Sequence, residues 1–241
     1  MLLIFVLGTL MILNKVSGQG CEPYKKYPNH SMCIYKTNKC QPGLTITSSG
    51  VLTSKQKDEV INLHNKLRKD IMNGTLKKFA PPAVSMSSMA WDNELAKIAQ
   101  RSAEQCKMEH DKNRKVDRYP SVGQNIYMKT LSYRKDLENT GPNMTQVIFS
   151  WFNEVKEFRF PPENIDPFKF NPDTGHYTQV VWAETKFIGC GFSTFTDKKY
   201  IQILTFCNYG PGGNVVGARM YQVKKEKVIP HRRHVVSRKE Q

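Results

Sequence analysis

Hydrophobic residues recur at helical spacing in the first half of the chain. One stretch begins at Thr53-Ser54-Lys55-Gln56, which is the pattern of a capping box, and stops at Asn73-Gly74. Its apolar face carries Val60, Leu63, Leu67 and Ile71. A second stretch places five residues on one face, namely Trp91, Leu95, Ile98, Ser102 and Cys106. Two amphipathic helices are therefore predicted, and the second aims Cys106 at whatever it packs against.

A third predicted helix runs from about Thr145 to Phe158. Its apolar stripe contains Val147, Trp151 and Phe158, and Glu154 points with that stripe. Burying an ionised carboxylate is costly unless it is paired or hydrogen-bonded. Glu154 is therefore expected to have a partner.

A β-hairpin is predicted after the helices. Ile188–Phe195 and Tyr200–Cys207 are rich in β-branched and aromatic residues, and the turn Asp197-Lys198-Lys199 separates them. If the hairpin is centred between Lys198 and Lys199, Cys190 stands opposite Cys207. A disulfide between them follows if this register holds.

The amino terminus indicates an extracellular protein. Met1 to Leu13 is apolar, the small residues Ser17 and Gly18 follow, and we expect residues 1–18 to be a signal peptide. The alternative is an uncleaved anchor or a buried helix. No later apolar stretch approaches the roughly 18 residues of a membrane-spanning helix, so the mature chain is expected to be secreted and soluble.

Cysteine and asparagine patterns agree with secretion. The six cysteines are an even number, as suits an oxidising compartment. Spacing alone leaves three pairings open for the four cysteines outside the hairpin. No spacing resembles a zinc finger or a redox Cys-x-x-Cys, so cysteine catalysis is not expected. Three tripeptides are N-glycosylation acceptors, beginning at Asn29, Asn73 and Asn143.

The chain is strongly basic, with a formal net charge of +15. Loss of Lys15 with the signal peptide would leave +14. Residues 224–241 hold seven lysines and arginines against Glu226 and Glu240, a net of +5, and are expected to form a disordered basic tail. The tail either serves solubility or attracts anionic glycans or a membrane surface. Because the protein is expected to be secreted, no nucleic acid partner is expected.

Two segments carry a family resemblance. Residues 175–185, Gly-His-Tyr-Thr-Gln-Val-Val-Trp-Ala-Glu-Thr, and residues 207–214, Cys-Asn-Tyr-Gly-Pro-Gly-Gly-Asn, resemble the paired signatures of the CAP superfamily. That superfamily includes antigen-five venom allergens, pathogenesis-related proteins and cysteine-rich secretory proteins. Thr205 departs from the second signature, where an apolar residue is usual. The resemblance extends to residues 64–68 and 123–126 and covers roughly residues 21–223.

The resemblance implies an α+β fold. We expect an α-β-α sandwich with a mostly antiparallel sheet of three or four strands between helical layers, stabilised by disulfides. Residues 19–50 would be a cysteine-containing extension and residues 51–223 the CAP domain. Residues 29–35 resemble the extension of arthropod antigen-five proteins, the venom and salivary members of the superfamily. This implies the pairs Cys21 with Cys33 and Cys40 with Cys106, beside Cys190 with Cys207.

The resemblance also implies a cleft lined by two histidines and two acids. On this chain the histidines are His110 and His176, one acid is Glu154, and the other acid is replaced by Gln124. Two neutral imidazoles and a carboxylate can hold zinc, with water completing the coordination. The alternative is that Glu154 bridges the histidines by hydrogen bonds. No cofactor is expected to be required.

Three functions remain after these arguments. The first is a secreted, non-enzymatic, antigen-five-like effector of venom, saliva or body fluid, which binds an extracellular protein target. The second is a carrier of a small lipid, such as a fatty acid or sterol. The third and least favoured is a metal-dependent hydrolase, because no sequence context marks an activated nucleophile. Channel blocking of the cysteine-rich secretory type is disfavoured, since no cysteine follows Cys207.

Overall fold

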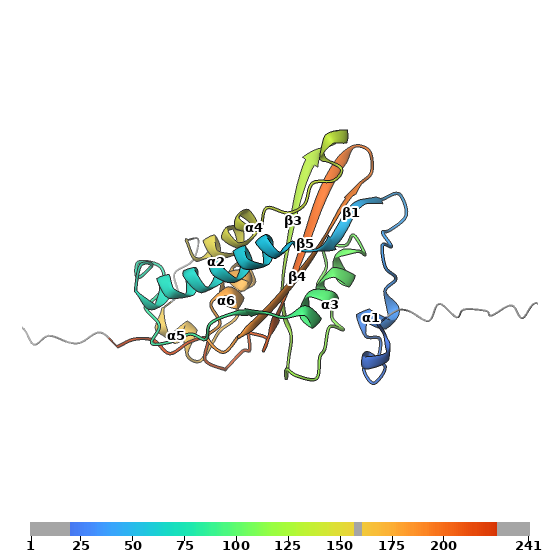
Figure 1. Ribbon diagram of the computed structural model, residues 1–241. Helices are drawn as coiled ribbons and strands as arrows, with labels where there is room; N and C mark the ends of the chain where they lie inside the picture. Colours follow the sequence, from blue (N-terminus) through green and yellow to red (C-terminus); the bar gives the residue numbers. More distant parts are fainter. Residues whose placement is uncertain (1–19, 157–160, 226–241) are drawn as a thin grey trace, which may run out of the picture.

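The computed structural model describes residues 20–156 and 161–225 (Figure 1). The expected signal peptide and most of the expected tail lie outside these residues. In chain order the helices and strands are α1 (Ser31–Ile34), β1 (Thr45–Val51), α2 (Ser54–Met72), β2 (Ala90–Trp91), α3 (Asn93–Ala103), β3 (Gly123–Ser132), α4 (Met144–Phe152), α5 (Pro162–Ile165), α6 (Gly175–Val180), β4 (Phe187–Thr196) and β5 (Tyr200–Gly210). Short 3₁₀ turns are η1 (Glu22–Tyr24), η2 (Lys135–Leu137), η3 (Asn153–Lys156) and η4 (Pro172–Thr174). None of the helices described in these two ranges is both long and apolar enough to cross a bilayer.

One mostly antiparallel sheet separates two helical layers. Its strand order is β1-β4-β5-β3, and the two-residue β2 pairs in parallel with β4. Helices α2, α4 and α6 cover one face and α3 covers the other (Figure 1). The α-β-α sandwich is confirmed, with a short fifth strand beyond the expected four. The hairpin register is also confirmed, since Cys190 is opposite Cys207 and the two are joined by a disulfide.

Helix α2 forms as its sequence predicts. Thr53 and Gln56 make a reciprocal capping box at its start. Its apolar face is buried against α4 and the sheet, and the chain leaves the helix at Asn73. Gly74 follows with φ of 75°, a backbone conformation that glycine adopts without strain.

The other two helices are shorter than predicted. Asp92 caps α3 by accepting the N–H groups of Glu94 and Leu95, so Trp91 lies before the helix, in β2. Cys106 lies beyond its end, at a φ of 55°. Helix α4 ends at Phe152, and the chain tightens into the 3₁₀ turn η3, which carries Glu154.

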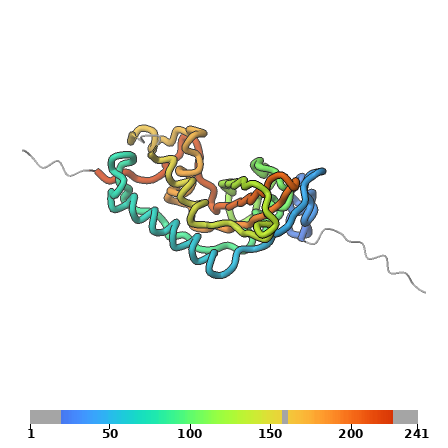
Figure 2. The backbone as a smooth tube through the Cα atoms, turned by 90° about the horizontal axis from the view of Figure 1, so that it is seen from above, coloured from blue at the N-terminus to red at the C-terminus, as the bar shows by residue number. Residues whose placement is uncertain are grey.

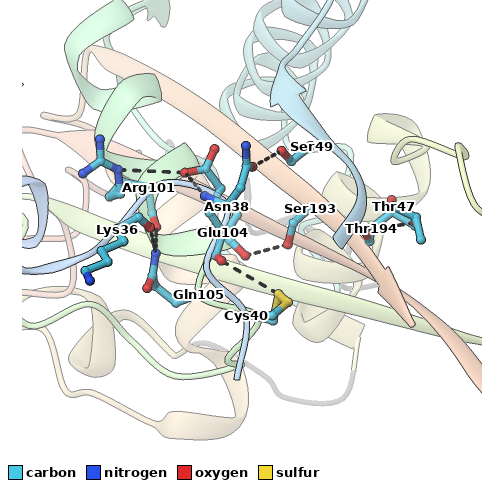
Figure 3. The surroundings of a disulfide bond; sticks show 12 residues. Lys36, Asn38, Cys40, Thr47, Ser49, Arg101, Glu104, Gln105, Ser193 and Thr194 are labelled. Atoms are coloured by element: carbon cyan, nitrogen blue, oxygen red, sulfur yellow. Dashed lines mark hydrogen bonds and ion pairs between the residues drawn. A yellow bond between two sulfur atoms is a disulfide. The ribbon is translucent and has the colours of Figure 1, made fainter. Parts of the chain in front are cut away.

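The amino-terminal extension is fastened to α3. Disulfides join Cys21 to Cys33 and Cys40 to Cys106, the pairs that the resemblance implies. Around the second disulfide, the carboxylate of Glu104 accepts the N–H of Asn38, and Gln105 donates to the carbonyl of Lys36 (Figure 3). Residues 45–50, which the sequence boundary placed in the extension, belong to β1 and pair with β4.

Two glycines let α3 approach β4 closely. A Cβ at Gly189 would lie 2.2 Å from the backbone nitrogen of Ala96, and one at Gly191 would lie 2.4 Å from the Cα of Gln100. The Gln100 side chain accepts the N–H of Phe192 and donates to its carbonyl. Helix α3 therefore packs with its backbone against the strand.

We predict that Gly191→Ala lowers the free energy of unfolding by about 3 kcal/mol, because the new methyl group meets backbone that cannot move aside. Gly141→Ala is the matched control, since its Cβ would make only ordinary side-chain contacts, with the ring of Phe192 at 3.6 Å and Nε2 of Gln56 at 3.9 Å. Urea unfolding with intact disulfides measures both. Equal stability of the two variants would contradict the close packing.

Candidate functional site

The carboxylate of Glu154 is held by the start of α6. Its Oε1 accepts a hydrogen bond of 2.6 Å from Nδ1 of His176. Its Oε2 accepts the backbone N–H groups of His176 and Tyr177, each at 3.0 Å. The partner predicted for Glu154 is therefore this helix start. Because Nδ1 donates to the carboxylate, the lone pair of the neutral His176 ring is on Nε2.

Gln124 holds the second histidine in a comparable way. Its Oε1 accepts from Nδ1 of His110 at 3.0 Å and from the N–H of Asp111 at 2.9 Å. Its Nε2 donates to Asn208 at 3.0 Å. Burial lowers the pKa of His110 and so favours the neutral ring. The lone pair of His110 is therefore also on Nε2.

Strand β3 contacts both His110 and His176. Gln124 and Asn125 are consecutive on this strand, so their side chains point to opposite sides. Gln124 bonds His110, and the side chain of Asn125 donates to the carbonyl of His176 at 3.1 Å. Residues on this one strand therefore contact both histidines.

A buried polar network supports this arrangement from α2. Nδ1 of His64 donates to the carbonyl of Val60, and its Nε2 accepts from the hydroxyl of Tyr209, which in turn accepts from Asn125. Burial lowers the pKa of His64 to about 4, so this ring is neutral at pH 7. His64 thus has the packing role expected of a histidine beside Leu63 and Leu67.

Arg68 is buried on α2, a role that was not predicted for it. Its guanidinium donates to three carbonyls at the end of α6 and just beyond it, at distances of 3.0 to 3.1 Å: Val180, Ala183 and Thr185. Burial lowers the pKa of Arg68 to about 10. The signal was available, since His64 and Arg68 are four residues apart and share the buried face of α2.

Of the two alternatives for His110, His176 and Glu154, the described residues show hydrogen bonding rather than a grouped set of metal ligands. Both oxygens of Glu154 are used in hydrogen bonds, which agrees with the alternative that it orients a histidine. No group of three His, Cys, Asp or Glu side chains within residues 20–156 and 161–225 is arranged to hold a metal ion. The two Nε2 atoms are the donors that remain, so zinc binding through them stays a prediction.

Comparison with known proteins identifies the family of this chain. The family described as "CAP: Cysteine-rich secretory protein family" matches residues 61–209, a span that holds the whole site. The chain belongs to this family. Venom allergen 5 of Microctonus hyperodae is 39% identical to this CAP protein over 199 residues, 80% of this chain and 82% of that protein. Venom allergen 3 of Solenopsis invicta is 38% identical over 230 residues, 91% and 93% of the two chains.

A solved structure shares the fold. The crystal structure of NaASP2 with Zn²⁺ superposes on this CAP protein with a TM-score of 0.58 and 27% sequence identity. The match covers 73% of this chain and 90% of that one.

The three glycosylation acceptors of this CAP protein are exposed. Asn29 precedes α1, Asn73 follows α2, and Asn143 caps α4. The side-chain oxygen of Asn143 accepts the N–H of Gln146, which leaves its amide nitrogen for a glycan. Glycosylation at these positions remains a prediction.

We predict that zinc binding requires both His110 and His176. Replacing either residue by alanine removes one of two donors, so zinc affinity measured by calorimetry should fall at least about tenfold. Gln124→Glu should strengthen binding, because it adds a negative charge beside the His110 ring. Undiminished binding by the double alanine variant would place the metal elsewhere.

Proposed function

We propose that this CAP protein is a secreted, non-enzymatic effector that binds an extracellular protein target. The observation that carries the proposal is the set of hydrogen bonds that the polar groups around His110 and His176 make with one another. The side-chain oxygens of Gln124 and Glu154 all accept hydrogen bonds from groups within the site. In the described part of the chain, no serine or threonine hydroxyl is bonded to the imidazole of His110 or His176, and no cysteine is free. A nucleophile paired with a base is what a covalent hydrolase needs.

Three further observations support secretion. The three disulfides suit an oxidising compartment. The relatives named above are venom allergens. The apolar stretch at residues 1–13 has the pattern of a signal peptide.

Carriage of a small lipid is the second candidate. An apolar cavity of about 90 Å³ lies between α4 and the sheet, with walls that include Tyr127, Leu131, Val147 and Ile203. The buried hydroxyl of Thr205, which also lines this cavity, has no hydrogen-bond partner among the described residues. A cavity this size holds about three waters, at roughly 30 Å³ each, so an acyl chain would need it to widen.

The metal-dependent hydrolase is the third candidate. NaASP2 has been solved with Zn²⁺, and this supports testing zinc on the two imidazoles of this chain. We infer that zinc, where it binds, is not required for the effector role. The basic tail, residues 224–241, would add attachment to anionic glycans or membrane surfaces.

Replacement of Glu154 separates the effector from the hydrolase. We predict that the purified wild-type protein does not hydrolyse peptide and ester panels, with or without zinc, and that Glu154→Gln leaves its retention on intact cells unchanged. In a hydrolase, a carboxylate that orients a histidine or serves as a base contributes about 10²-fold or more to the rate.

Thermal unfolding controls for loss of fold in Glu154→Gln. Turnover by the wild type that disappears in a folded Glu154→Gln variant would overturn the proposal.

A further inference from the structure

A groove of about 550 Å³ lies where the described chain ends. Three of its lining residues are lysines and four are apolar, and none is acidic. They are Lys77, Lys78, Pro81, Pro82, Pro162, Val223 and Lys224. We refer to these residues as the basic groove. Figures 1 and 2 both show the C-terminal segment leaving beside the turn that follows α2, at the opposite end of the molecule from the N-terminal extension.

Backbone hydrogen bonds join the two segments that form the floor of the basic groove. The N–H of Lys224 donates to the carbonyl of Pro82 at 2.7 Å, and the N–H of Val84 donates to the carbonyl of Gln222 at 2.8 Å. The hydroxyl of Tyr221 donates to the carbonyl of Pro81 at 3.0 Å. The φ angle of each proline is also fixed by its ring, so the backbone that forms the groove is conformationally restricted.

The lysines of the groove carry three positive charges at the protein surface. Lys77, Lys78 and Lys224 are exposed, and within the described ranges none forms a salt bridge. By contrast, Lys26 and Lys66 each pair with an aspartate. Three unpaired ammonium groups around one concavity favour a ligand that carries several negative charges.

We propose that the basic groove binds a linear sulfated polysaccharide. Its sulfates would meet the three lysines, while the apolar faces of its sugar rings pack on the prolines and Val223. A single extended chain enters a concave groove, whereas a planar bilayer is reached by protruding apolar side chains. Five more cations lie in the sequence outside the described residues, and the test below separates their effect from that of the groove: Lys227, Arg232, Arg233, Arg238 and Lys239.

This inference rests on the proposed secretion and extends attachment from the tail to the folded domain. Its failure is distinguishable from failure of the effector proposal, because glycan binding is measured without reference to hydrolysis. The test uses the full-length protein and a heparin oligosaccharide fixed to a sensor surface, read in about 0.15 M NaCl, where weak long-range attraction is screened.

The groove variant is Lys77→Gln with Lys78→Gln. Its matched control is Lys55→Gln with Lys97→Gln, which removes the same charge from exposed positions elsewhere. Lys55 is at the far end of α2, about 25 Å away at 1.5 Å per residue. We expect the groove variant to bind heparin roughly tenfold more weakly and the control less than about twofold, because local contacts exceed the effect of net charge.

Two more variants make the result decisive. Lys224→Gln keeps the backbone bond to Pro82 and should also weaken binding. Arg232→Gln with Arg233→Gln should add its own loss to that of the groove. The proposal is overturned if the groove and control variants weaken binding equally, or if the tail variant alone removes it. It is also overturned if the lysines of the groove govern binding to phosphatidylserine vesicles but not to heparin.

Discussion

Three hydrogen bonds to one carboxylate join the turn η3 to the start of α6. Glu154 accepts all three from His176 and Tyr177, and its side chain is only 21% exposed. Because donors left unpaired in such a place cost roughly 1–3 kcal/mol each, the turn η3 and the start of α6 are bound to one geometry. The orientation of the His176 ring follows from that geometry, and so does the free Nε2 that any ligand would meet.

The remaining structure holds α6 from its other sides. The side chain of Asn125 on β3 donates a hydrogen bond to the carbonyl of His176. Arg68 on α2 donates to the carbonyl of Val180, the last residue of α6, and to those of Ala183 and Thr185. Helix α2, strand β3 and the turn η3 thus each bond to α6 or to the residues that follow it. Within the described residues, the three lysines of the basic groove, at the end of α2, form no salt bridge. This division underlies our proposal that the protein acts by binding.

Local sequence predicted those features that depend on neighbours in the chain. The turn at Lys198 and Lys199 sets the register that brings Cys190 to Cys207, and the capping box sets the start of α2. The need of Glu154 for a partner was also predictable, but the partner was not, because two of its three donors are backbone N–H groups 22 and 23 residues away. Likewise, no periodicity brings residues 77–82 beside 162 and 223–224.

The central claim is that Glu154 orients His176, and nitrogen NMR of the imidazole tests it most directly. With ¹⁵N-labelled histidine, the neutral ring of His176 should show a protonated Nδ1 and an unprotonated Nε2, since Nδ1 donates to Glu154. In Glu154→Ala this tautomer preference should disappear, while the neutral ring of His110 keeps its own. A His176 ring protonated on Nε2 in the wild-type protein would contradict the account.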